Sequence, residues 1–97
     1  MLLTCLMEEA AEVQKEAAKC LRFGTDNVDP EDSAGRTNAE KLRDELIDHD
    51  SIYCLLVNSC ILPNDRDHTL NRMTAKIEKV LDSLECSDRL GRLTEDT

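Results

Sequence analysis

The sequence has very few aromatic residues, few residues that break helices and no long apolar run. Phe23 and Tyr53 are its only aromatic side chains, and its 97 residues include 3 Gly, 2 Pro and no Trp. No apolar run approaches the length of a membrane-spanning helix, and the apolar stretch 2–7 is too short for a signal peptide. A core has to be built from Leu, Ile, Val, Met and Ala, as in a helical bundle. We therefore expect an all-α fold.

Basic residues are scarce relative to acidic ones. Twelve Lys and Arg against 21 Asp and Glu give a net charge of −9. This charge argues against non-specific binding to nucleic acid or to an anionic membrane, since both are themselves negative. It does not argue against a nucleotide whose phosphates are bound through a metal ion. The length predicts a single domain, residues 1–97, with a small core that a second subunit completes.

Paired cysteine motifs are also absent. The five cysteines form no Cys-x-x-Cys pair, and their number is odd, which argues against a zinc ribbon or a disulfide scaffold. Most of them fall within helical patterns, where a reduced thiol serves as a small apolar residue. We therefore expect a reducing, cytoplasmic location. The five residues are Cys5, Cys20, Cys54, Cys60 and Cys86.

Two further metal motifs do not fit. Residues 26–30 resemble the start of a calcium loop, but the required glycine is replaced by Glu31. A carboxylate-bridged di-iron bundle uses Glu-x-x-His, and Leu46 stands three residues before His49. His49 is interpreted as a core histidine, and His68 as an exposed residue in a turn.

The first two predicted helices flank a polar loop. The first runs from Leu3 to Phe23 and stops at Gly24, and the second begins at the capping box Thr37–Glu40 and ends before Pro63. The apolar stripe expected to be buried is Leu3, Leu6, Met7, Ala10, Val13, Ala17 and Leu21 in the first helix, and Leu42, Leu46, His49, Tyr53, Leu56, Val57 and Cys60 in the second.

Residues 25–36, between these helices, are rich in Asp, Glu, Pro, Ser and Gly. The loop is interpreted either as a lid over a binding site or as a disordered segment. A third helix is predicted from Thr69, after a turn at 63–67. Its stripe is Leu70, Met73, Ile77, Val80, Leu81 and Leu84. The tail is expected to add a short helical turn around Leu90 and Leu93 and then to fray over residues 92–97.

Carboxylates recur three residues apart on both of the first two helices. Glu9 with Glu12, and Glu45 with Asp48, each place two side chains on one helix face about a turn apart. In each pair the first carboxylate borders the apolar stripe, where a charge is costly without a partner, and no matching Lys or Arg set faces it. Packed side by side, the helices would bring four carboxylates together. Oxygen ligands of this kind favour a hard cation, Mg²⁺ or Mn²⁺.

The motif Glu8-Glu9-x-x-Glu12, followed at a distance by Glu45-x-x-Asp48, resembles the signature of the MazG-like family of all-α nucleoside triphosphate pyrophosphohydrolases. The stretches 19–24 and 37–38 also look like its small phage and bacterial members. The resemblance covers residues 3–57. It implies hydrolysis of a nucleoside triphosphate to the monophosphate and pyrophosphate with Mg²⁺ or Mn²⁺, in a homodimer or homotetramer. Some phage relatives favour purine deoxynucleotides, including dGTP.

Carried over by position, the resemblance implies roles for individual residues. The metal ligands would be Glu9, Glu12, Glu45 and Asp48, with Glu9 or Glu12 as the catalytic base and Glu8 outside the ligand set or contacting another subunit. Candidate substrate contacts are Lys15, Lys19, Arg22 and Asn38, and further ones are Phe23, Arg72 and Lys76. Two other classes stay open: a non-enzymatic helical interaction module, and a member that binds nucleotide or metal without turnover.

Overall fold

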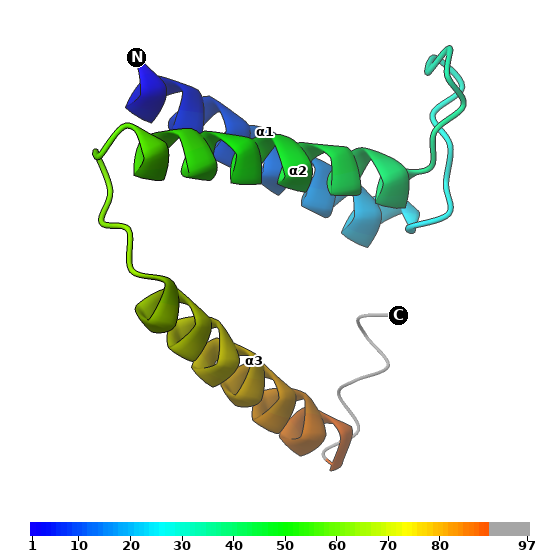
Figure 1. Ribbon diagram of the computed structural model, residues 1–97. Helices are drawn as coiled ribbons and strands as arrows, with labels where there is room; N and C mark the ends of the chain where they lie inside the picture. Colours follow the sequence, from blue (N-terminus) through cyan, green and yellow to red (C-terminus); the bar gives the residue numbers. More distant parts are fainter. Residues whose placement is uncertain (90–97) are drawn as a thin grey trace. The chain divides into compact units, whose positions relative to one another are not determined.

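The structure, a computed structural model, describes residues 1–89, with side chains for residues 1–85. Within this range the chain forms three α-helices and no strand: α1 (Leu2–Phe23), α2 (Asn38–Asn58) and α3 (Arg66–Arg89) (Figure 1). The predicted all-helical class is confirmed. The helical turn predicted around Leu90 and Leu93, and the frayed tail at 92–97, lie outside the described residues.

The chain divides into two compact units, Met1–Pro63 and Asn64–Thr97. The first unit contains α1, α2 and the loop between them, and the second contains α3. A single domain requires that these two units pack together, and this stays a prediction. The candidate site lies wholly in the first unit.

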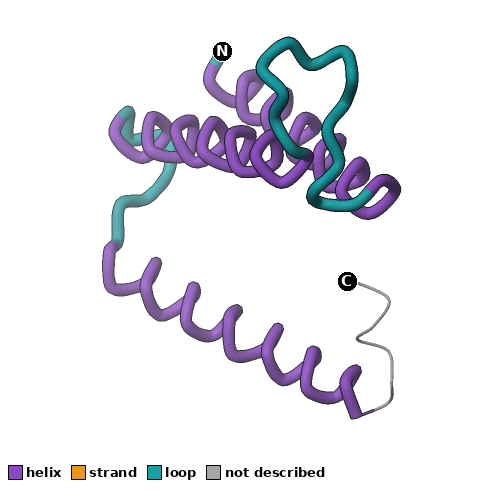
Figure 2. Tube along the Cα trace, turned by 90° about the vertical axis from the view of Figure 1, so that its right-hand side faces the viewer, coloured by secondary structure: helices purple, strands orange, loops and turns teal. Residues whose placement is uncertain are grey.

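Helices α1 and α2 lie side by side and run in opposite directions, joined by the loop at one end (Figures 1 and 2). Helix α1 ends where Gly24 adopts a φ of 93°, a conformation that glycine tolerates because it has no Cβ. Helix α2 begins at the predicted capping box. The Thr37 side chain accepts from the Glu40 amide, and the Glu40 side chain accepts from the Thr37 amide.

The loop between the two helices is ordered by hydrogen bonds rather than by apolar packing. The Asp32 carboxylate accepts from the amides of Ala34 and Arg36, at 3.4 and 2.9 Å, and pairs with the Arg36 guanidinium at 3.4 Å. An isolated antiparallel bridge links Val28 to Thr37. The Arg36 amide in particular lowers the pKa of Asp32 below its usual value. These contacts favour the interpretation of the loop as a defined segment; whether it acts as a lid stays a prediction.

The face of α1 that packs on α2 differs from the predicted stripe. Leu3, Met7 and Leu21 are exposed, whereas Glu9 is half-buried and Glu16 is buried with 6% of its surface accessible. Seven residues make nearly two helical turns, so Glu9 and Glu16 share one face. The contact face is thus turned away from the predicted stripe and includes these carboxylates. The buried and half-buried residues of α1 are Leu2, Cys5, Leu6, Glu9, Val13, Glu16, Ala17, Lys19 and Cys20. Three of them, Leu6, Val13 and Ala17, belong to the predicted stripe.

Helix α2 shows a similar but smaller rotation of its contact face. Leu56 is fully buried and is the only such apolar side chain in the described part of the chain. Leu46 and Tyr53, both members of the predicted stripe, are 45% and 41% exposed. His49, interpreted from the sequence as a core histidine, is only half-buried. Glu45 lies among the contacting residues Asn38, Leu42, His49, Ile52 and Leu56.

The C-terminal end of α2 closes with a Schellman pattern. The Cys60 amide donates to the Val57 carbonyl, and the Ile61 amide donates to the Leu56 carbonyl, at 3.0 Å each. Cys60 has a φ of 61°, in the left-handed region that favours glycine. The helix end is well hydrogen-bonded but carries an unfavourable residue type.

Helix α3 begins at Arg66, three residues before the predicted start. The Asp65 carboxylate accepts from the His68 amide at 3.0 Å, and the Asp65 carbonyl accepts from the Thr69 amide and hydroxyl. His68 is exposed, as predicted, but it lies in the first turn of the helix. In the described part of the chain no helix is both long and apolar enough to cross a membrane.

Candidate metal centre

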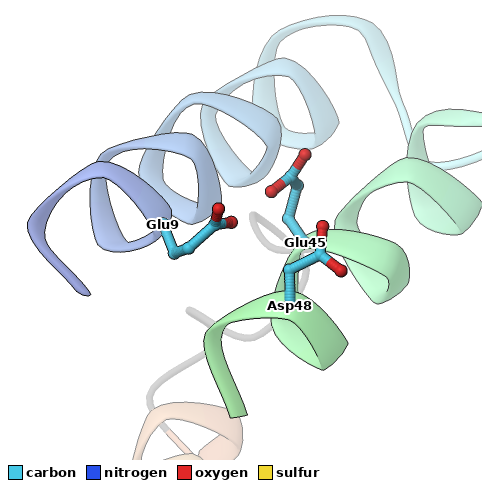
Figure 3. A group of neighbouring side chains, drawn as sticks. All are labelled: Glu9, Glu45 and Asp48. Atoms are coloured by element: carbon cyan, nitrogen blue, oxygen red, sulfur yellow. The ribbon is translucent and has the colours of Figure 1, made fainter. Parts of the chain in front are cut away.

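Three of the four predicted ligands meet between α1 and α2. Glu9 projects from α1, and Glu45 and Asp48 project from α2, toward one another (Figure 3). One carboxylate oxygen from each residue lies within 4.8 Å of the others. Glu9 and Glu45 are half-buried and Asp48 is exposed, so the cluster opens to solvent on one side. The two motifs predicted four carboxylates together, and the structure brings three of them into one cluster.

Helix periodicity explains why these carboxylates face each other. Glu9 follows Leu2 by seven residues and precedes Glu16 by seven, and Glu45 stands in the same relation to Asn38 and Ile52. Residues at this spacing lie on one side of a helix, so both glutamates lie within the helix–helix contact. Asp48 is one turn after Glu45 and falls at the edge of that contact.

The cluster is electrostatically strained when it holds no cation. The pKa of Glu45 is raised above its usual value, chiefly by partial burial, then by hydrogen bonding to the Glu9 carboxyl and by the charges of Glu9, Asp48 and Glu12. Within the part of the chain that the structure describes, none of the three clustered residues forms an ion pair with Lys or Arg. The main contributions of neighbouring charges to the raised pKa of Glu45, from Glu9, Asp48 and Glu12, are all repulsive.

A divalent cation fits this donor set. The three ligand atoms are carboxylate oxygens, which Mg²⁺ and Mn²⁺ prefer over softer donors, and the exposed side leaves room for water or substrate oxygens. A cation at this point would offset the repulsion among Glu9, Glu45 and Asp48. His49, although it lies on the same face, is not part of the cluster.

Glu12 and Glu8 lie outside the three-residue cluster. Glu12 is exposed, but its charge raises the pKa of Glu45, so it is near the cluster without sharing its centre. Glu8 is exposed and does not join the group, in line with the outward direction predicted for it. The structure therefore brings together Glu9, Glu45 and Asp48, with Glu12 at the rim.

The four residues predicted to contact substrate have different surroundings. Lys15 is exposed, and the Arg22 guanidinium lies over the Phe23 ring at 5.1 Å from its centroid. Lys19 is half-buried, and its Nζ is 3.3 Å from Glu16 Oε1. Asn38 is 2% exposed, and its Nδ2 donates to the Gly24 carbonyl at 3.0 Å, so it ties α2 to the end of α1.

Glu16 is the residue near the site that sequence reasoning missed. Glu16 is absent from the residues that the sequence predicts to be buried or to form the site, whereas the structure buries it. A signal was present in the sequence, because Glu16 follows Glu9 by seven residues and so shares its face. A residue on the same helix face as a predicted ligand, seven positions along, is expected to lie in the same helix–helix contact.

Comparisons with protein-family models, with curated proteins and with solved structures found no match to this chain. The case for a function therefore rests on the two carboxylate motifs, on their meeting between α1 and α2, and on the chemistry of the residues around them.

Proposed function

We propose that the protein is a metal-dependent nucleoside triphosphate pyrophosphohydrolase, which converts a nucleoside triphosphate and water to the monophosphate and pyrophosphate. The observation that carries the proposal is the meeting of Glu9, Glu45 and Asp48, with oxygens within 4.8 Å of one another and no basic partner among the described residues. Support comes from the order of the two motifs along the chain, which resembles the MazG-like signature.

In this proposal the clustered carboxylates and Glu12 have separate roles. Glu9, Glu45 and Asp48 hold Mg²⁺, or Mn²⁺ in its place. When bound, the cation supplies charge neutralisation for the triphosphate and lowers the pKa of the attacking water. Glu12 lies at the rim, is exposed and is free of the three-oxygen group, so it accepts the proton of the water that attacks the α-phosphorus.

We also propose that a second copy of the chain completes the fold. Leu56 is the only fully buried apolar side chain in the described residues, while Leu3, Met7 and Leu21 of α1 are 55%, 74% and 76% exposed. Large apolar side chains left exposed on one helix are what a subunit interface would cover. The resemblance to homodimeric and homotetrameric enzymes supports the same assembly. Light scattering coupled to size-exclusion chromatography tests it, and a monomer at micromolar concentration would contradict it.

The reaction is tested by measuring pyrophosphate release from a panel of ribo- and deoxyribonucleoside triphosphates with Mg²⁺, with Mn²⁺ and with EDTA. We expect release with either metal and none in EDTA. Asp48→Asn lowers the rate by about 100-fold or more, the scale seen when one electrostatic group is removed from a site. Asp50→Asn is the matched control, because Asp50 is exposed on the same helix and outside the cluster.

Each alternative has a distinct signature in the same panel. A protein that binds nucleotide or metal without turnover releases no pyrophosphate but still gives a binding isotherm with nucleotide. A helical interaction module shows neither, and its properties do not respond to metal. Absence of release from folded protein with both metals would overturn the proposed reaction. The ranking of nucleotides in the panel also tests the preference for purine deoxynucleotides that phage relatives suggest.

A further inference from the structure

Helix α3 carries an apolar stripe that is exposed along its length. Its members follow one another at alternating intervals of three and four residues, and each is between 39% and 55% exposed. This alternation is the heptad pattern by which two helices pack along each other in a coiled coil. At the rise of an α-helix the stripe is about 21 Å long. Its members are Leu70, Met73, Ile77, Val80 and Leu84, with Leu81 at its edge.

The charged side chains of α3 are divided between the two sides of this stripe. On a helical projection the basic residues Arg72, Lys76 and Lys79 follow one side, which we call the basic flank. The other side, the acidic flank, is formed by Asp67, Glu78, Asp82 and Glu85. All of these residues are exposed. Arg66, in the first turn of the helix, lies in line with the stripe.

Each flank repeats one sign of charge at spacings that are unfavourable in an isolated helix. Lys76 stands four residues after Arg72 and three before Lys79, and the acidic flank has the same spacing around Asp82. Like charges at these spacings repel each other across one helical turn. Within residues 66–85 of α3, no side chain takes part in an ion pair. Both flanks therefore need opposite charges from outside the helix.

A second copy of α3 that runs parallel and in register supplies these charges on both sides. A two-fold axis parallel to the two helices sets one apolar stripe against the other. The same rotation brings the basic flank of each copy beside the acidic flank of the other copy. An antiparallel pair would instead set basic flank against basic flank and acidic flank against acidic flank. Charge complementarity thus selects the parallel arrangement.

The charge pattern favours a second α3 over an acidic partner. The first unit, for example, contains thirteen acidic and six basic residues, so it complements the basic flank but repels the acidic flank. An anionic lipid surface has the same limitation. Only a partner with both flanks in matching positions satisfies both sides of the stripe, and a second copy of α3 has them by symmetry.

We propose that α3 is a self-association helix that packs in parallel against α3 of a second copy, stripe against stripe and basic flank against acidic flank. This surface is distinct from the exposed α1 residues considered above, and the proposal depends neither on metal binding nor on hydrolysis. Two heptads are few for a coiled coil of free helices. The full chain is therefore the material for the test.

The orientation is tested by disulfide formation in Leu70→Cys, with diamide as the oxidant and mass spectrometry to identify the linked peptides. A parallel pair in register places position 70 of one copy beside position 70 of the other, so we expect this self-link. Ala75→Cys is the matched control, because Ala75 is exposed on the side of α3 opposite the stripe. We expect the self-link at position 70 to form about tenfold faster or more than at position 75.

The stripe is tested by adding Ile77→Glu to the Leu70→Cys protein. The new carboxylates would lie against each other in the middle of the apolar contact, so we expect the self-link to form about tenfold more slowly or less. Ala75→Glu, on the opposite side of the helix, is the matched control and should leave the rate unchanged. Circular dichroism of each variant checks that its helix content is retained.

The flanks are tested by exchanging charges, which keeps the apolar stripe intact. Lys76→Glu and Glu78→Lys each set like charges against each other across the pair, so each should slow the self-link by about twofold or more, the scale of exposed ion pairs. The double variant exchanges the two charges and should recover most of the lost rate. Additive losses in the double variant would overturn the contact between opposite flanks.

The other outcomes are equally decisive. Equal rates of self-linking at positions 70 and 75 in folded protein would overturn the parallel pair, whatever the hydrolysis assay shows. An unchanged rate in Ile77→Glu would overturn the stripe as the contact surface. A self-link with the expected response to Ile77→Glu and to the charge exchange supports the pairing of α3, even in a protein that releases no pyrophosphate.

Discussion

Acidic residues have opposite environments in the carboxylate cluster and at the loop end of the same helix pair. At the cluster, Glu9, Glu45 and Asp48 face one another without a basic partner among the described residues, and the pKa of Glu45 is raised. At the loop end, Asp32 and Glu40 accept backbone hydrogen bonds, and the pKa of each is lowered. The hydrogen bonds at the loop end stabilise the fold, whereas the mutual repulsion of the clustered carboxylates destabilises it.

Replacing one carboxylate of the cluster by a basic side chain should give the largest effect on stability. In Glu45→Lys the new ammonium lies beside Glu9 and Asp48 and replaces the repulsion with ion pairs. We expect the metal-free protein to be more stable by about 1.5 kcal/mol, the lower bound for hydrogen bonds to charged groups. Thermal unfolding in EDTA measures this.

The same variant should lose its response to metal. Wild-type protein is expected to gain about 2.7 kcal/mol when Mg²⁺ is present at 100 times its dissociation constant, since the cation binds only the folded state. Glu45→Lys should show no such gain. Equal stabilisation of both proteins by Mg²⁺ would mean that the cation binds somewhere else.

Removing a hydrogen bond at the loop end should lower stability, in contrast to the gain expected for Glu45→Lys. Thr37→Ala deletes the hydroxyl that accepts from the Glu40 amide and should cost about 1 kcal/mol, whether or not metal is present. Urea denaturation measures the loss. Ser51→Ala is the control, because that hydroxyl donates to a carbonyl within α2 and caps nothing. An equal loss in both variants would argue against a specific cap.

The other end of α2 gives a smaller test of the same comparison. Cys60 completes a Schellman pattern with a φ of 61°, so its hydrogen bonds are satisfied while its side chain strains the backbone. Cys60→Gly should stabilise the first unit by about 0.5 kcal/mol, the net of relieved strain and the greater freedom of glycine when unfolded. Destabilisation on denaturant titration would show that the Cys60 side chain contributes contacts of its own.

The contributions of the two regions to stability should depend on pH in opposite directions. A raised pKa means that the folded state binds more protons at Glu45, so this contribution to stability is present below pH 4.5 and is lost as the pH rises through the folded pKa. For Asp32 the pKa is lowered, so its contribution is present above pH 3.8 and is lost as the pH falls through the folded pKa.

The matching variants make this difference measurable in EDTA. Glu45→Gln should be slightly more stable than wild type at pH 7, with the advantage shrinking toward pH 4.5. Asp32→Asn should be slightly less stable at pH 7, with the deficit shrinking below pH 3.8. Denaturant titrations at a series of pH values check both, and curves that change in the same direction would remove the distinction between the regions.

The parts of this structure that follow from local spacing were predicted from the sequence. The capping box at Thr37, the helix stop at Gly24 and the two carboxylate pairs all depend on residues a few positions apart. The buried face of α1 was predicted only in part: Leu6, Val13 and Ala17 are half-buried, but the other residues of the predicted stripe are exposed. Its small and apolar residues spread around much of the helix, and only packing against α2 selects the side that carries Glu9 and Glu16.

The hydrogen bonds of the loop and the early start of α3 were not predicted. Loop order depends on Asp32 accepting two amides and on the bridge between Val28 and Thr37, contacts that a scan for hydrophobic periodicity does not detect. The start of α3 depends on Asp65 as a capping side chain, and Asp65 lies in the stretch 63–67 that was interpreted as a turn. In both cases a polar side chain, not an apolar pattern, determines the local structure.

Calorimetric titration of metal-free protein with Mn²⁺ at pH 7 tests the central claim most directly. The account predicts saturable binding to wild type and to Asp50→Asn, and no binding, or binding too weak to saturate, in Glu45→Gln and Asp48→Asn. Indistinguishable isotherms for all four folded proteins would contradict the assignment of Glu9, Glu45 and Asp48 as a divalent-cation site, and the proposed hydrolysis would lose its structural basis.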